Sequence, residues 1–190
     1  MRMIYGNSVI SDAAGWRPET SPVIRRPQST DGFAVWQLIG QTPQLDDNSL
    51  YCNLLQCSHF AATSAIAEAG GAVVGWLSGH VPPGQPDTLF VWQVCVAEQA
   101  RGRGLGKKMI GDVLARPESA GIRHVQCTIT QDNAASWALF TAVARTVKAQ
   151  LSQIEHFLKD EHFAGRHDAE FAVSIGPFDR ERAAAALNAD

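Results

Sequence analysis

The segment TLFVWQVCVAEQARGRGLGK, residues 88–107, predicts a strand that runs through a glycine-rich turn into a helix. Its first nine residues are rich in Thr, Phe, Val and Trp and contain neither Gly nor Pro, which favours a buried strand. Three glycines follow within residues 101–106, and apolar residues then recur at helical spacing between Leu105 and Leu114. Because glycines admit a close approach to the backbone and the first helical turn has free N–H groups, this arrangement indicates an anion site.

Three phosphate-binding patterns test the identity of that anion. The P-loop requires Gly-Lys-Ser/Thr, and here Lys108 follows Gly106 and Lys107. The dinucleotide fingerprint G-x-G-x-x-G would need a glycine where Lys107 stands. The third pattern, Arg/Gln-x-x-Gly-x-Gly/Ala, is met by Arg101, Gly104 and Gly106. An ordinary helix cap after a glycine turn is the alternative interpretation.

The composition is that of a globular protein and excludes several classes. A chain of 190 residues with 45% hydrophobic and 18% charged residues predicts one domain. A net charge of −3 gives no reason to expect nucleic acid as a partner, and no apolar run is long enough to span a membrane. Residues 1–20 lack the apolar stretch of a signal peptide. The four cysteines show no metal-binding spacing, so we expect no metal and reduced thiols in a cytoplasmic protein.

The predicted elements define one domain with two tails. Residues 1–21 are expected to be a weakly ordered lead-in, residues 22–176 the domain, and residues 177–190 a tail that ends in a frayed helix. The predicted order within the domain is β-α-α-β-β-β-α-β-α, followed by strands that are harder to place. Residues 150–157 fit either a strand or a helix.

Two local predictions concern helices. A helix that residues 29–31 would cap and Gly40 would end is expected to carry Phe33, Trp36 and Ile39 on its core face, because these residues recur at helical spacing. Asp132 is expected to be the N-cap of the helix that begins near Ala134, since Asp is a favoured capping residue.

The glycine loop and the order of elements resemble the GCN5-related N-acetyltransferase (GNAT) family. The loop at residues 101–106 is similar to that family's acyl-CoA pyrophosphate loop, and DNAASWALF at residues 132–140 resembles its N-x-x-A/S-x-x-L-Y segment. The resemblance implies an α+β fold, with a mixed central sheet that is splayed at the acyl-CoA slot and flanked by helices. It also implies that Asn133 contacts the cofactor. Phe140 replaces the Tyr that usually protonates the leaving thiolate, so that role is vacant or filled by another group or by water.

Four further blocks resemble one subgroup, the diaminobutyrate acetyltransferases of ectoine biosynthesis. They are LDDNSLY at residues 45–51, CSHF at 57–60, PDTLFVWQV at 86–94 and HDAE at 167–170. The resemblance implies that acetyl is transferred from acetyl-CoA to the 4-amino group of L-2,4-diaminobutyrate, by direct attack in a ternary complex, and that the enzyme is a homodimer. An acetyltransferase for another small amine, such as a polyamine, and a non-catalytic acetyl-CoA-binding module are the alternatives.

The family resemblance also assigns residues to the cofactor. The strand backbone after Trp92 would hold the pantetheine arm as an added strand, and the glycine loop would bind the pyrophosphate. The implied cofactor-binding residues are Val94, Cys95, Val96, Gly102, Arg103, Gly104, Leu105, Gly106, Lys107 and Asn133. Cys95 could be considered as a nucleophile that carries the acetyl group. This role is disfavoured, because no general base lies near Cys95 in the sequence.

The acceptor site must hold a molecule with two ammonium groups and one carboxylate. Ammonium groups favour carboxylates and aromatic faces, which makes Asp46, Asp47, Tyr51, Trp92 and Glu170 the candidate substrate-binding residues. Asp46, Asp47 and Tyr51 are also the candidate catalytic groups, since the attacking amine must lose a proton. Each of the five has a structural alternative as a loop, cap, core or surface residue.

Overall fold

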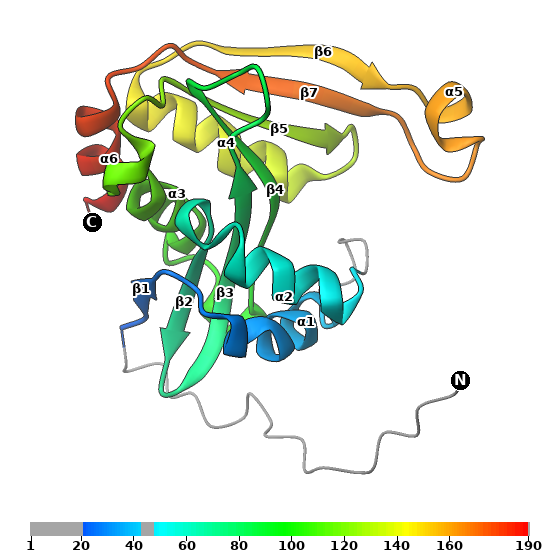
Figure 1. Ribbon diagram of the computed structural model, residues 1–190. Helices are drawn as coiled ribbons and strands as arrows, with labels where there is room; N and C mark the ends of the chain where they lie inside the picture. The colour runs from blue at the N-terminus through cyan, green and yellow to red at the C-terminus, as the bar shows by residue number, and fades with distance from the viewer. Residues whose placement is uncertain (1–20, 43–47, 190) are drawn as a thin grey trace, which may run out of the picture.

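A seven-stranded mixed sheet forms the centre of the molecule (Figure 1). The computed structural model describes residues 21–42 and 48–189. The strands lie in the order β1-β2-β3-β4-β5-β7-β6, and among them only β4 and β5 pair in parallel. The strands are β1 Val23–Arg25, β2 Ala65–Ala69, β3 Ala72–His80, β4 Thr88–Val96, β5 His124–Thr130, β6 Leu151–Phe157 and β7 Glu170–Ile175.

Helices cover both faces of this sheet. Along β2, Ala65 and Ala67 belong to the buried cluster that contains Met109 of α3, whereas Ile66 belongs to the cluster that contains Val35 of α1. Successive strand residues face opposite sides, so each face has its own core. The helices are α1 Gly32–Gly40, α2 Leu50–Ser58, α3 Leu105–Ala115, α4 Ala134–Val147, α5 Lys159–Phe163 and α6 Arg180–Asn188, with short 3-10 turns at Ser29–Asp31, Ala61–Thr63, Glu98–Ala100 and Pro117–Ser119.

The sheet opens between β4 and β5. These two strands pair only where residues 88–90 lie opposite residues 124–126. Beyond that point β4 continues to pair with β3, and β5 continues to pair with β7, so the two strands separate toward their C-terminal ends (Figure 1). This opening confirms the predicted splayed sheet.

A β-bulge at Trp92 lies beside the opening. In the pairing of β3 with β4, Gly79 lies opposite Val91 and Ser78 lies opposite Gln93, which leaves Trp92 as the extra residue. Ser78 Oγ accepts a 3.1 Å hydrogen bond from the Gln93 N–H. A bulge locally re-aims the strand, and the Trp92 side chain is 48% exposed.

The predicted orientation of α1 was wrong in part. Phe33 and Trp36 are exposed, whereas Val35, Leu38 and Ile39 are buried. The buried face of α1 is therefore rotated about the helix axis away from the face that carries Phe33 and Trp36. Residue spacing gives the helical period, but the packing of α1 on β3 and α2 decides which face is turned inward.

Two other local predictions are settled by the backbone. Asn133, and not Asp132, is the N-cap of α4, because Asn133 Oδ1 accepts a 3.0 Å hydrogen bond from the Ser136 N–H. Asp132 instead accepts a hydrogen bond from the Thr130 hydroxyl. The ambiguous segment at residues 150–157 contains strand β6, which forms one edge of the sheet.

The C-terminal helix α6 is not frayed. Ala183, Ala184 and Leu187 are buried against the rest of the molecule. A Cβ atom added to Gly111 of α3 would lie 2.9 Å from Leu187 Cβ, so a glycine is needed where α6 crosses α3. The expectation of a frayed tail was therefore wrong: α6 completes the core on this face of the sheet. None of the helices in the described residues is long and apolar enough to cross a bilayer.

Candidate active site

The open edge of β4 offers unpaired backbone groups. The N–H groups of Gln93 and Ala97 donate toward β3. Because N–H groups alternate between the two edges of a strand, those of Val94 and Val96 face the gap where β5 has moved away. An extended molecule that carries amides can pair with such an edge as an added strand would.

A cleft of about 710 Å³ runs from this edge past the glycine loop to α4. At its end α3 begins, with Gly104 as the N-cap at φ +71°. The left-handed conformation at Gly104 is one that side chains disfavour. The first turn of α3 directs its N–H groups toward this end of the cleft, as an anion site requires.

Gly106 also has a packing reason to be glycine. A Cβ atom there would lie 3.0 Å from Leu139 Cδ1 of α4. The missing side chain therefore lets α3 approach α4, a constraint in addition to the predicted approach of a phosphate. Gly106 nevertheless lines the cleft.

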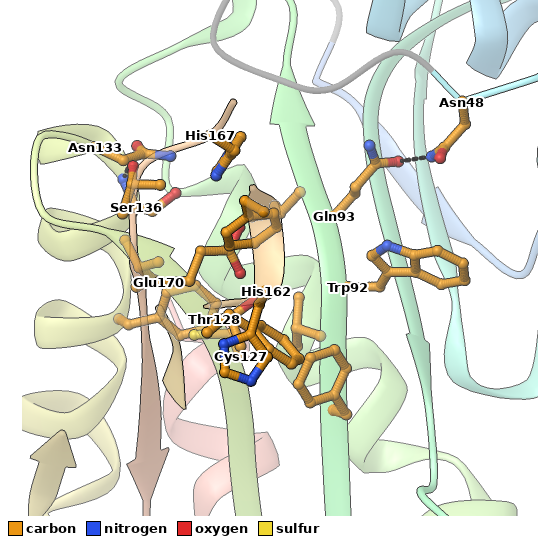
Figure 2. A pocket seen from close by; sticks show the side chains of 18 of the residues that line it. Asn48, Trp92, Gln93, Cys127, Thr128, Asn133, Ser136, His162, His167 and Glu170 are labelled. Atoms are coloured by element: carbon orange, nitrogen blue, oxygen red, sulfur yellow. Dashed lines mark hydrogen bonds between the residues drawn. The ribbon is translucent and has the colours of Figure 1, made fainter. Parts of the chain in front are cut away.

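A second cleft, of about 740 Å³, lies between β4 and the walls made by β5, α4 and the α5 segment (Figure 2). Its walls carry aromatic and polar side chains and one carboxylate. Its lining residues are Asn48, His80, Phe90, Val91, Trp92, Gln93, Val94, Cys127, Thr128, Ile129, Thr130, Asn133, Ser136, Phe140, Phe157, His162, Phe163, His167 and Glu170. None of these described residues is Lys or Arg.

The two clefts meet at a junction. Among the residues that the structure describes, only Val94, Asn133 and Ser136 line both of them. Val94 belongs to the open edge of β4, whereas Asn133 and Ser136 belong to the first turn of α4. A long molecule in the first cleft can therefore present its end to a small molecule in the second cleft at this junction.

Trp92 and Glu170 lie on opposite walls of the second cleft (Figure 2). Glu170 begins β7 and pairs with Thr130 of β5, which holds its backbone beside the opening. Trp92 is placed by the bulge in β4, and its ring centroid is 6.4 Å from that of His80. An aromatic face and a carboxylate together suit a cationic acceptor.

The histidines of this cleft differ in their surroundings. His80 packs against Phe90 with ring centroids 5.2 Å apart, and burial lowers its pKa. His162 Nδ1 accepts a 2.9 Å hydrogen bond from the Leu158 N–H, which leaves Nε2 to carry the ring proton. His167 Nδ1 lies 2.7 Å from the Asp168 carbonyl oxygen, to which it can only donate. These two bonds fix the tautomers of the neutral rings.

Comparison with known proteins then decides the family. The sequence pattern of the acetyltransferase (GNAT) family matches residues 30–143. This chain is a GNAT acetyltransferase. The splayed sheet, the glycine loop and the N-terminal turn of α4 are all within or beside the matched region.

Several curated relatives of this GNAT acetyltransferase share one name. The L-2,4-diaminobutyric acid acetyltransferase of Methylotuvimicrobium alcaliphilum is 46% identical over 155 residues, which cover 82% of this chain and 90% of that protein. The L-2,4-diaminobutyric acid acetyltransferase of Halomonas elongata is 43% identical over 166 residues, covering 86% of each. The similarity therefore extends over most of the chain.

Solved structures agree with that comparison. The diaminobutyrate acetyltransferase EctA from Paenibacillus lautus, in complex with its substrate L-2,4-diaminobutyric acid and coenzyme A, superimposes with a TM-score of 0.80. It is 37% identical, and the match covers 84% of this chain and 97% of that one. Ard1 from Thermoplasma volcanium, 15% identical with a TM-score of 0.63, shares the fold.

The GNAT fold brings most of the expected cofactor residues into the first cleft. Of the ten, nine line it; the exception is Arg103, whose side chain is exposed. Cys95 is 5% exposed, and burial raises the pKa of its thiol to about 12. A thiol with that pKa stays protonated at neutral pH, which argues against Cys95 as a nucleophile.

The expected acceptor residues are brought together only in part. Trp92 and Glu170 line the second cleft. Tyr51 lies on α2 with 69% of its side chain exposed and is not among the lining residues. Asp46 and Asp47 lie outside the described residues. The role of these three in binding or catalysis stays a prediction.

Some lining residues were missed by the sequence analysis. Ser136 was quoted within the DNAASWALF segment, but its place at the junction follows only from the fold. Gln93 and Asn48 both line the second cleft and are joined by a 2.7 Å hydrogen bond from Asn48 Nδ2 to Gln93 Oε1 (Figure 2). His162 lies on α5, a five-residue helix with no clear signal in the sequence.

Proposed function

We propose that this GNAT acetyltransferase transfers acetyl from acetyl-CoA to the 4-amino group of L-2,4-diaminobutyrate. One observation carries the proposal: the slot along β4 opens at Val94 and Ser136 into a cleft that carries Glu170 and Trp92. The relatives named for this substrate, at 37–46% identity, support it.

The acyl donor would lie along the open edge of β4. The amide-bearing pantetheine arm would pair with Val94 and Val96, and the pyrophosphate would be bound at the N-terminal turn of α3. A backbone N–H at the end of the slot would then bond the thioester oxygen and polarise the carbonyl as charge develops on it.

The acceptor would lie in the second cleft with its 4-amino group at the junction. We assign Glu170 and Trp92 to its ammonium groups, with Asp46, Asp47 and Tyr51 as further candidates. A primary ammonium with a pKa near 10.4 has roughly one neutral molecule in 10³ at pH 7, so a carboxylate or water must help to remove its proton. The neutral nitrogen then attacks the thioester carbon directly, because the protonated Cys95 thiol offers no covalent route.

A panel of amines tests this function. L-2,4-diaminobutyrate should release free thiol from acetyl-CoA with the highest kcat/KM, and NMR of the product should show acetyl on the 4-nitrogen. 1,3-Diaminopropane is the matched control, since it has the same spacing of amines but no carboxylate. A higher kcat/KM with 1,3-diaminopropane or a polyamine would show that the acceptor is another amine. If no amine is acetylated, the protein would be a non-catalytic acetyl-CoA-binding module.

We also propose a cytoplasmic homodimer that serves ectoine synthesis under osmotic stress. The exposed strand β6 supports the dimer, because it forms one edge of the sheet and carries Ile154 with 67% of its side chain exposed. The cysteines support a reducing compartment, since Cys52, Cys57, Cys95 and Cys127 are all free. Light scattering during gel filtration should give twice the mass of the chain; a monomer mass at micromolar concentration would contradict the dimer.

A further inference from the structure

Acetyl transfer from a thioester creates a negative charge on sulfur. The amine nitrogen forms a bond to the acetyl carbon, the carbon–sulfur bond breaks, and its electron pair stays on the sulfur. The nitrogen loses one proton and the thiolate later gains one, so the products are an amide and a free thiol. A donor beside the sulfur would stabilise this charge as it develops.

The junction of the two clefts is where that sulfur must lie if the proposed function holds. The acetyl group has to reach the acceptor there, and the sulfur is one bond away from it. In the described part of the chain, the residues that line both clefts are Val94, Asn133 and Ser136. Val94 has an apolar side chain. Asn133 caps α4 through Oδ1, which accepts from the Ser136 N–H, and the family resemblance assigns Asn133 to cofactor contact, so its Nδ2 is a competing donor that Ser136→Ala leaves in place.

Ser136 is the hydroxyl at this junction. Its backbone N–H is bonded to the cap, which fixes the residue in the first turn of α4. Its Oγ makes no hydrogen bond with any residue in the described ranges 21–42 and 48–189. A helical Ser often satisfies its hydroxyl at a carbonyl of the preceding turn, so an Oγ without such a bond beside two clefts is available to a ligand.

Other polar groups near the junction are less suitable. The Thr130 hydroxyl donates to Asp132. Cys127 is 4% exposed, and burial raises the pKa of its thiol. Phe140, one turn after Ser136 on the same face of α4, lines the second cleft but carries no polar atom. Tyr51 is exposed on α2.

We propose that the Ser136 hydroxyl donates a hydrogen bond to the departing CoA sulfur and is a catalytic residue of the acetyl transfer. The hydroxyl does not give up its proton, because an alcohol is a much weaker acid than a thiol with a pKa near 8.5. It stabilises the thiolate until water supplies the proton. A hydrogen bond to a charged group changes a rate by about 10- to 100-fold.

The test compares Ser136→Ala with wild type in single-turnover acetylation of L-2,4-diaminobutyrate. The transfer rate should fall about 10- to 100-fold, with the Kd for acetyl-CoA from calorimetry unchanged. Thr141→Ala is the matched control, since it removes a hydroxyl from α4 outside both clefts and should leave the rate unaltered.

A double variant separates a chemical role from a structural one. Phe140→Tyr in the Ser136→Ala background places a phenol on the same helix face, and it should recover most of the lost rate. An undiminished transfer rate in Ser136→Ala would overturn the proposal. So would a weakened Kd for acetyl-CoA with no recovery in the double variant, because that result assigns Ser136 to cofactor binding. If wild type fails to acetylate diaminobutyrate but acetylates another amine, the proposed function fails and the same variants are measured with that amine.

Discussion

Asn48 Nδ2 donates a 2.7 Å hydrogen bond to Gln93 Oε1 in the lining of the second cleft. The bond joins the residue that precedes the N-cap of α2 to the centre of β4. Gln93 is buried, Asn48 is half-buried, and the contact between them is partly shielded from water. In the sequence Asn48 directly follows Asp46 and Asp47, the two carboxylates proposed to act on the acceptor.

Loss of this contact should affect the acceptor and not the cofactor. Asn48→Ala is expected to raise the KM for diaminobutyrate about 2- to 10-fold, the range of one neutral hydrogen bond. The Kd for acetyl-CoA, measured by calorimetry, should stay at the wild-type value. A lower kcat with an unchanged KM would instead place the bond in the chemical step.

The carboxylates should be separable by isosteric substitution. Glu170→Gln, Asp46→Asn and Asp47→Asn each remove one charge, and those that meet an ammonium should lower kcat/KM for diaminobutyrate by about 10-fold or more. Glu155→Gln, on the exposed face of β6, is the control and should behave as wild type. If all three variants retain wild-type kinetics, the acceptor site has been assigned to the wrong cleft.

The glycine loop should be sensitive at Gly104 for a conformational reason. Gly104→Val places a β-branched residue at φ +71°, which costs about 1–3 kcal/mol and distorts the N-terminal turn of α3. We expect acetyl-CoA to bind about 10-fold more weakly or worse. Gly84→Val is the control, since Gly84 has φ +83° in a loop that lines neither of the two large clefts. Equal affinities in both variants would exclude the loop from cofactor binding.

The pH profile should rise without a descending limb near neutrality. The attacking amine must lose its proton, so kcat/KM should increase up to about tenfold per unit between pH 6 and 8.5. His80 does not alter this trend, because burial lowers its pKa and it is neutral above its usual range. Because the pKa of His80 is lower in the folded protein, the unfolded state binds its proton more readily. The free energy of unfolding should therefore decrease as the pH falls below about 6.5, where the unfolded chain begins to take up that proton. A descending limb near pH 7, in wild type and in Phe140→Tyr, would reveal a titrating general acid.

Helix α6 should contribute to stability. Leu187 is 1% exposed against α3, so Leu187→Ala is expected to lower the free energy of unfolding by about 2–5 kcal/mol. Urea denaturation followed by circular dichroism measures the change. Arg182→Ala, on the exposed side of the same helix, should alter it by less than about 0.5 kcal/mol. Equal effects of the two variants would mean that α6 adds little to the core.

The cofactor side of the fold could be predicted from sequence because it depends on local signals. Contiguous segments predicted the strand at residues 88–96 and the glycine turn at positions 102, 104 and 106. They also predicted the cap of α4 to within one residue. The backbone performs the binding there, so the positions of a few glycines identify it. The same signals did not reveal the second constraint on Gly106, because its neighbour Leu139 lies on another helix.

The acceptor side could not be predicted to the same extent, because it is assembled from distant segments. Trp92 and Glu170 line one cleft because β5 pairs with β7. The spacing of residues in the sequence does not predict that pairing. Ser136 and His162 show the same limit. Their residue types are common, and only the convergence of β4, α4 and the α5 segment gives them a shared environment.

The short parallel pairing of β4 with β5 joins two half-sheets through only three residue pairs in the described part of the chain. One half holds β1 to β4, and the other holds β5, β7 and β6. A donor whose amides bridge the gap acts as a removable strand, so it couples the two halves into one cooperative folding unit. Hydrogen exchange in β4 and β5 should then slow together when the donor binds. The concentration of the acyl donor would thus set the rigidity of the enzyme as well as its rate.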